Sequence, residues 1–276
     1  MQIWIGTSGY SYPDWVGDFY PSGTRPGKML NYYCQYFPLV ELNYTFYRPP
    51  TVSALAGQAD KTPPGFQFLV KVPQTISHEL RRDDLPSFRL ACGELARRGR
   101  LLGVLLQLPQ SCHYGKSTLE WLAAVGDGLH GLRPAVEFRH RSWVRDEIPD
   151  WLAARGMDLV GVDAPDLPGL YPGGWVQSGR RAYIRFHSHN AANWYAGDKE
   201  RYDYFYSDEE LADWVEAAAA AERATDEGLF LFNNCHRGQA VVNAQRLAEL
   251  FSERAPQLPV AAPFVTPEPV QRTLFD

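Results

Sequence analysis

The sequence lacks an excess of positive charge and has few cysteines. Its 276 residues include 27 basic and 32 acidic side chains, which give a net charge of −5. A basic surface over the whole molecule is therefore excluded, and nucleic-acid binding would need a local patch. The four cysteines are scattered, without a Cys-x-x-Cys pair. This argues against a zinc knuckle or a redox motif and indicates reduced thiols in a cytoplasmic protein.

Long apolar runs and a nucleotide-binding motif are also missing. The chain passes from Met1 into a short apolar segment at residues 3–5, without the pattern of a signal peptide or a membrane span. We therefore expect no membrane partner. No Gly-x-Gly-x-x-Gly follows a predicted strand, which argues against a doubly wound open sheet and predicts no nucleotide cofactor.

Eight short apolar segments alternate with helical patterns along the chain. Right-handed parallel crossovers of this number close into a barrel, so the sequence predicts an α/β fold with a single (β/α)8 TIM-type barrel over residues 1–254. Strands are expected at residues 2–6, 39–46, 66–72, 101–108, 135–139, 158–163, 181–187 and 229–233. Helices are expected at residues 26–37, 51–61, 85–98, 117–125, 144–155, 207–224 and 239–254. Five prolines in residues 255–276 predict an extended tail, either flexible or wrapped along the barrel.

The fifth strand places two charges on one face. Period-two alternation puts Glu137 and Arg139 on the same side, and both would be costly to bury unless paired or facing a wet pocket. In a TIM-type barrel such a pocket lies at the carboxyl ends of the strands. Polar side chains occupy the predicted ends of strands two to eight: Glu41, Asn43, Lys71, Gln107, Glu137, Arg139, Asp163, Arg185, His187, Asn233 and Asn234. They predict an active site, or alternatively an ion-pair lattice that only fixes the barrel core.

Charges of both signs are balanced in this set. Three carboxylates (Glu41, Glu137, Asp163) face three cations (Lys71, Arg139, Arg185). A multinuclear metal site needs more carboxylate and imidazole ligands than these. The identity of any cofactor stays open, and a single Mg or Mn ion on Glu137 and Asp163 is compatible with the pattern. Two arginines and a lysine favour an anionic ligand, a phosphate or a carboxylate.

Catalytic roles follow from the same residues. Glu137 or Glu41 is the expected general base, with His187 as a partner acid, and Asp163 is a further catalytic candidate. Lys71 is expected to contact a phosphate and not to form a Schiff base, because neighbouring carboxylates would raise its pKa.

Aromatic residues follow the predicted strands in unusual number, where rings can stack on bases or sugars. They are Tyr10, Tyr12, Trp15, Phe46, Tyr47, Trp143, Trp194, Tyr195, Tyr202, Tyr204 and Tyr206. The alternative is a hydrophobic lid packed on itself. The predicted substrate contacts in the loops are Tyr10, Tyr12, Tyr47, His78, Trp143 and Tyr204.

Several motifs carry a resemblance to a known family. They are Ile5–Trp15, Phe19-Tyr20-Pro21, Val40–Tyr47, Phe68–Lys71, Gln107-Leu108-Pro109, Glu137–His140 and Phe232-Asn233-Asn234. Over roughly residues 3–253 they resemble the YecE-like family, also called domain of unknown function 72. The resemblance implies a TIM-type barrel similar to the xylose isomerase and endonuclease IV group, and no settled activity. The histidine-rich metal set of endonuclease IV is not matched.

The chain ends in a second short motif. Gln271-x-x-Leu274-Phe275 resembles the peptide by which bacterial DNA-processing proteins dock on the sliding clamp, with a Leu-Phe anchor suited to a groove. The alternative is a terminus folded back on the barrel.

These observations predict an enzyme acting on a phosphate-containing substrate, with nucleic-acid hydrolysis in DNA processing as the leading hypothesis. A sugar isomerase or lyase is the first alternative. A non-catalytic module recruited to the clamp by its tail is the second.

Overall fold

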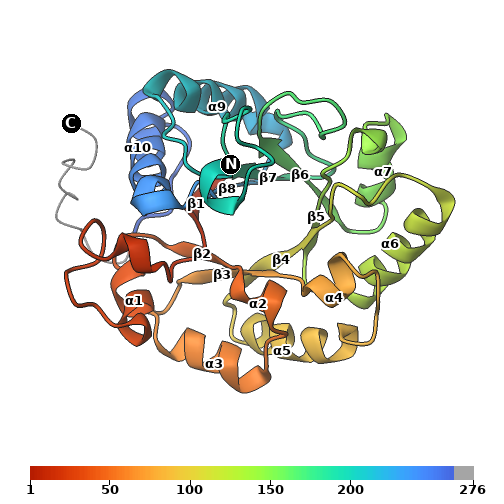
Figure 1. Cartoon of the computed structure of the whole chain (residues 1–276), viewed down its shortest axis with the longest axis horizontal. Helices are drawn as coiled ribbons and strands as arrows, with labels where there is room; N and C mark the ends of the chain where they lie inside the picture. The colour runs from red at the N-terminus through yellow and green to blue at the C-terminus, as the bar shows by residue number, and fades with distance from the viewer. Residues whose placement is uncertain (264–276) are drawn as a thin grey trace.

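The computed structural model describes residues 1–263, apart from the side chains of residues 198 and 199. Eight parallel strands close into a barrel in chain order (Figure 1), which confirms the predicted (β/α)8 TIM-type fold. The strands are β1 (Gln2–Ser8), β2 (Leu39–Leu42), β3 (Gln67–Lys71), β4 (Leu101–Gln107), β5 (Pro134–Glu137), β6 (Asp158–Asp163), β7 (Arg181–Phe186) and β8 (Glu227–Phe232). The clamp-like motif at Gln271, Leu274 and Phe275 lies outside the described residues.

Helices follow most strands and surround the barrel. They are α1 (Pro26–Tyr33), α2 (Tyr44–Tyr47), α3 (Val52–Asp60), α4 (Gln74–Ser77), α5 (Leu85–Arg97), α6 (Lys116–Gly128), α7 (Glu147–Ala153), α8 (Asp198–Arg201), α9 (Asp208–Ala221) and α10 (Gln239–Arg254). A capping box of Ser207 and Glu210 opens α9. Among residues 1–263, each helix is too short or too polar to cross a membrane.

Two predicted strands end earlier than expected. The second stops at Leu42, and the chain then turns into α2, where the Thr45 hydroxyl donates to the carbonyls of Leu42 (2.8 Å) and Lys71 (2.6 Å). The fifth stops at Glu137, so Arg139 lies in the loop beyond the strand. The alternation therefore predicted correctly the side on which Arg139 lies. Its guanidinium reaches that side from the loop and not from the strand.

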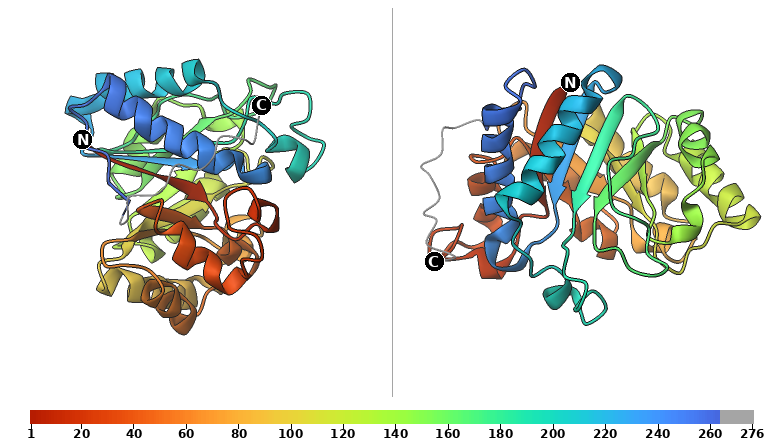
Figure 2. Two further views of the ribbon diagram at one scale, coloured as in Figure 1. Left: turned by 90° about the vertical axis from the view of Figure 1, so that its left-hand side faces the viewer. Right: turned by 90° about the horizontal axis from the view of Figure 1, so that it is seen from above.

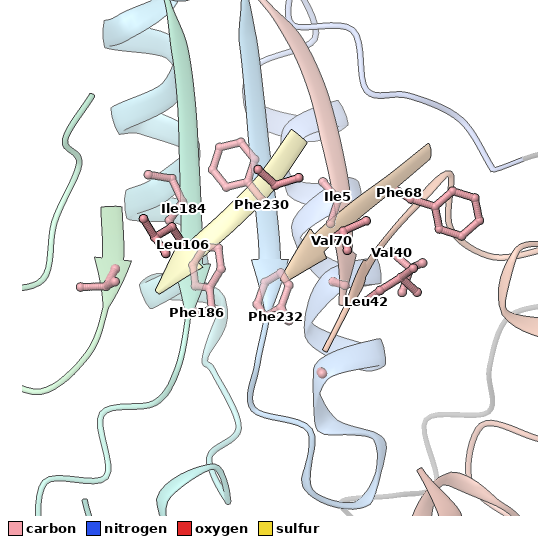
Figure 3. Packing of buried hydrophobic residues seen from close by; sticks show 14 of the residues in the cluster. Ile5, Val40, Leu42, Phe68, Val70, Leu106, Ile184, Phe186, Phe230 and Phe232 are labelled. Atoms are coloured by element: carbon pink, nitrogen blue, oxygen red, sulfur yellow. The ribbon is translucent and has the colours of Figure 1, made fainter. Parts of the chain in front are cut away.

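Two apolar layers hold the barrel. The outer layer packs between strands and helices, as Figure 3 shows for Ile184 and Phe186 of β7 beside Phe230 and Phe232 of β8. The rings of Phe186 and Phe232 stack at 4.3 Å. The inner layer fills the barrel and consists of Leu39, Leu69, Leu102, Leu105, Ala135, Val160, Tyr183, Leu229 and Leu231. This inner apolar layer separates the ion pair of Arg181 and Asp158 at the amino end of the barrel from the charged side chains at the carboxyl end.

The chain beyond α10 begins by following β1. Ile3 donates its backbone N–H to Pro259 (2.8 Å) and accepts from Ala261 (2.7 Å), while Leu258 is buried. In Figure 2, α9 and α10 lie side by side over β1 and β8. The described start of the predicted tail is therefore wrapped along the barrel.

Candidate functional site

Arg185 of β7 lies at the centre of a buried ion network at the carboxyl end of the barrel. Its Nε and Nη2 donate to the two oxygens of Glu41 at 3.0 and 2.7 Å, and its Nη1 donates to Glu137 Oε2 at 2.6 Å. Tyr183 donates to Glu41, and Ser8 accepts from Arg185 at 3.2 Å. Such burial is tolerated because every charge meets a charged hydrogen-bond partner.

Glu137 joins this network to a second group of side chains. Its Oε1 forms an ion pair with Arg139 and lies 3.3 Å from His187 Nε2, while Arg139 Nη2 lies 3.1 Å from the same nitrogen. Asn233 holds His187 Nδ1 at 3.1 Å. Burial, together with Arg139, lowers the pKa of His187 to about 3. Burial alone would raise the pKa of Glu137, but Arg139 and Arg185 hold it well below its usual range. His187 is therefore neutral and Glu137 ionised at neutral pH.

Lys71 stands at the end of β3 beside this network. Its Nζ lies 4.5 Å from the centroid of the Phe46 ring and makes no hydrogen bond or ion pair within residues 1–263. Burial, and then Arg185, lower the pKa of Lys71 to about 8. The expectation that carboxylates would raise this pKa was wrong, because burial and the arginine outweigh them. His78 packs against the same ring at 4.8 Å, and burial, with Lys71 and Arg139, lowers the pKa of His78 to about 4.

Asp163 lies outside this layer. It pairs in register with Phe186, whereas Arg185 pairs with Val162, so its side chain points outward from the barrel. There it accepts from Trp214 Nε1 at 2.7 Å and contacts His189. The predicted charge balance was therefore wrong, since two carboxylates, Glu41 and Glu137, face the three cations.

The placement of Asp163 also separates the two ligands suggested for a divalent metal. Glu137 faces the inside of the barrel, whereas Asp163 faces α9. Within the described part of the chain, no three His, Cys, Asp or Glu side chains form a group suited to a metal ion.

Asp163 belongs to an outer groove of about 580 Å³ beside α9. His189 bridges Asp163 and Glu210, with 2.7 Å between Nδ1 and the Glu210 carboxylate, and Tyr204 donates to Glu210. Tyr204, predicted to contact substrate, therefore lies beside Glu210 and His189 and makes no hydrogen bond to the network around Arg185 in the described residues. The hydrogen bond between His189 and Asp163 raises the pKa of His189 to about 9, although burial opposes this.

Replacing His189 by asparagine should make stability less dependent on pH above neutrality. A histidine whose pKa is raised in the folded state stabilises fully below its unfolded pKa, about 6.5, and this contribution is lost as pH rises through 9. Because the side chain is 37% exposed, we expect a loss of about 1 kcal/mol at pH 6. Melting temperatures of both proteins should converge near pH 10. The raised pKa of His189 is contradicted if the two melting temperatures differ by the same amount at every pH. It is also contradicted if His130→Asn, on the exposed surface, has an equal effect.

Four of the eleven aromatic residues are buried and belong to the core, not to a stacking rim. Trp143 was predicted to contact substrate, but it is 1% exposed, stacks on Phe138 at 4.3 Å and donates to the Cys112 carbonyl. The other buried rings of the set are Trp15, Trp194 and Tyr206. Tyr47, at 72% exposed, and Tyr195, at 62%, remain accessible.

The remaining predicted contacts are positioned by hydrogen bonds. Tyr10 donates to Gln58 at 3.1 Å, and Tyr12 donates to the Ser8 carbonyl beside Arg185. Gln107 pairs in register with Glu137 and donates to the Leu108 carbonyl at 2.8 Å.

Two asparagines complete the predicted set, and they differ in role. Asn234 is buried and ties the Tyr204 carbonyl to Asn243, so it is structural and not a substrate contact. Asn43 stands at the start of α2, and its Oδ1 is buried without a hydrogen-bond partner within residues 1–263.

Sequence reasoning missed Tyr183, Ser8, His189 and Glu210. Tyr183 had a signal, because it shares the inward face of its strand with Arg185, two residues on. Ser8 ends the first strand, from which no polar group was taken. The bridge from His189 to Glu210 joins a loop to a helix, which no spacing in the sequence indicates.

Comparisons with known proteins extend over almost the whole chain. The family model described as a protein of unknown function, DUF72, matches residues 4–269. The chain is 27% identical over 270 residues to the UPF0759 protein YunF of Bacillus subtilis, spanning 90% of this chain and 94% of that one. The crystal structure of a DUF72 family protein from Thermotoga maritima is similar at a TM-score of 0.83 and 36% identity, over 91% of this chain and all of that one. A second, from Enterococcus faecalis, has a TM-score of 0.81 at 25% identity, over 91% and 96% of the two chains. The chain therefore belongs to the DUF72 family.

Proposed function

We propose that this protein is an enzyme that binds a phosphate- or carboxylate-bearing substrate at the carboxyl end of its barrel. One observation carries the proposal: three cations share this layer with two carboxylates. Both oxygens of Glu41 are occupied by Arg185. Lys71 and Arg139 are left facing the open end with unused donors, since the Lys71 ammonium and Arg139 Nη1 make no hydrogen bond within the described chain. An incoming anion would restore the charge balance and satisfy these donors.

The same contacts revise the expected general base. Glu41 and Glu137 are both bound to Arg185, so their main role is to position the cations. An imidazole that is neutral at pH 7 keeps a ring nitrogen that can accept a proton, although a lowered pKa makes it a weaker base than an ordinary histidine. His187 and His78 both have a lowered pKa, and His187 also contacts Arg139 directly. We assign proton transfer to these histidines.

Phosphate binding should depend on Arg139. We expect inorganic phosphate to bind about 10- to 100-fold more weakly to Arg139→Gln, which loses a charged hydrogen-bond donor. Isothermal titration calorimetry measures the affinity, and circular dichroism checks the fold. Arg141→Gln is the matched control, because Arg141 is exposed and pairs with Asp166. Equal affinities for all three proteins, or no binding to any of them, would reject the anion site.

The phosphate could belong to a polymer or to a small molecule. Nucleic-acid hydrolysis in DNA processing is favoured by two exposed rings, Tyr47 at the end of α2 and Tyr195 in the loop after β7. With a net charge of −5, the molecule would have to bind DNA through a local surface. Incubation with nicked, abasic and single-stranded DNA in the presence of Mg, Mn or Zn tests hydrolysis. Turnover of phosphorylated or carboxylated sugars instead would identify an isomerase or lyase.

Docking on a sliding clamp is proposed from the terminal motif alone. A peptide of residues 264–276 should bind a purified clamp, and replacing Leu274 and Phe275 by alanine should abolish this binding. A peptide that fails to bind removes the recruitment hypothesis and leaves the anion site untouched.

A further inference from the structure

We propose that Lys71 forms an imine, a Schiff base, with an aldehyde or ketone that carries a phosphate or carboxylate. This inference rests on the proposed function, because the anion site would orient the carbonyl group. It adds a covalent step and a substrate class to that function.

The surroundings of Lys71 distinguish it from the other lysines whose side chains the structure describes. It stands at the carboxyl end of β3 and remains partly accessible, with Nζ over the Phe46 ring at 4.5 Å. No carboxylate lies within ion-pair distance of this nitrogen in residues 1–263. By contrast, Lys28, Lys61 and Lys116 are exposed on the outer surface.

This environment favours the free amine, which is the nucleophilic form. Burial and Arg185 lower the pKa of Lys71 to about 8. Roughly a tenth of the lysine is then neutral at pH 7, compared with well under a thousandth for an ordinary lysine. Arg139, which also lowers this pKa, keeps its Nη1 free within the described residues to hold the anionic group of the substrate.

Imine formation is balanced without a further reagent. The lone pair of Nζ attacks the carbonyl carbon, a C–N bond forms, and the carbonyl oxygen takes up a proton to give a carbinolamine. The amine proton then leaves, the C–O bond breaks with release of water, and the C=N bond remains. We assign the proton transfer to the imidazole of His78, which contacts the same Phe46 ring as Lys71.

Two sources supply this chemistry. A free phosphorylated aldehyde presents the carbonyl and the anion in one small molecule. The abasic site of DNA presents a deoxyribose aldehyde between two phosphates. Both share an aldehyde next to a phosphate, and the test has one arm for each.

The first arm traps glyceraldehyde 3-phosphate with cyanoborohydride, which reduces the imine to a stable amine. Peptide mapping by mass spectrometry should find Lys71 modified at least ten times faster than Lys28, Lys61 and Lys116, which serve as internal controls in the unmodified protein. Unphosphorylated glyceraldehyde should react with Lys71 at least ten times more slowly, and inorganic phosphate should compete. Equal rates at all lysines, or equal rates for the two aldehydes, overturn the proposal.

The second arm incubates the protein with an abasic duplex and cyanoborohydride and looks for a covalent complex by denaturing electrophoresis. A complex with the abasic but not the intact duplex supports DNA as the source, and labelling by the small aldehyde alone supports a metabolite. Lys71→Arg should abolish trapping in either arm, whereas Lys61→Arg should leave it unchanged.

The failure of the imine is distinguishable from the failure of the anion site. Phosphate binding and labelling are therefore both measured on the unmodified protein. If the unmodified protein binds phosphate but Lys71 is not labelled, the imine is rejected and the anion site stands. If neither occurs, both proposals fall.

Discussion

Replacing Arg185 by methionine should lower the free energy of unfolding by about 3–5 kcal/mol at pH 7, because the change leaves two buried carboxylates without their partner. Arg185 is 1% exposed, and Glu41 and Glu137 are fully buried. Methionine has a similar volume, so the loss reports the charge and not a cavity. Urea denaturation measures the difference.

The same variant should recover part of its stability in acid. In the unmodified protein the depressed pKa of Glu137 contributes stability that is present above its unfolded pKa, about 4.3, and lost as pH falls below it. Without Arg185 the carboxylate of Glu137 protonates more readily, so the difference in stability between the two proteins should narrow as pH falls toward 4.

Arg180→Met provides the matched control. Arg180 pairs with Asp226 through side chains that are 62% and 63% exposed, and such a pair contributes about 0–1 kcal/mol. An equally small loss for Arg185→Met would mean that water reaches the inner network, which would contradict its burial.

Replacing Trp143 by alanine should cost about 3–5 kcal/mol of stability, as expected for a large buried ring. The side chain is 1% exposed, stacks on Phe138 and donates to the Cys112 carbonyl at 2.8 Å. Its removal leaves a cavity and an unpaired Cys112 carbonyl in the loop after β4. Urea denaturation again gives the loss.

The control for this prediction is Tyr47→Ala, an exposed aromatic of the same set. At 72% exposure, its removal should change stability by about 0.5 kcal/mol or less. If Trp143 were instead a ligand contact, Trp143→Ala would weaken phosphate binding and leave the unfolding midpoint almost unchanged. The more conservative Trp143→Phe should retain both folding and binding.

The sequence predicted the barrel and its charged end because period-two alternation fixes which residues share a face. The alternation placed Glu41, Glu137, Arg185 and His187 on the inner side, and the structure brings them into one network. The number of strands could also be predicted, since each apolar segment is short and followed by a helical pattern.

The sixth strand shows where alternation stops being informative. Residues 158–163 read Asp-Leu-Val-Gly-Val-Asp, with an acidic residue at each end and apolar ones between. A parallel strand buried on both faces carries no hydrophobic signal for its inner side. The pairing of Asp163 with Phe186 settles the matter, because cross-strand partners face the same way.

The sequence by itself determined the fold class, the end of the barrel that carries the charges and most of the residues there. Only the tertiary structure decided that Asp163 belongs to a separate groove, that Tyr204 donates to Glu210 of that groove, that Trp143 is core, and that the pKa of Lys71 is lowered and not raised. The physical reason is common to all of these: burial and electrostatic balance depend on distances between strands, loops and helices far apart in the chain, and a pattern along one strand does not contain those distances.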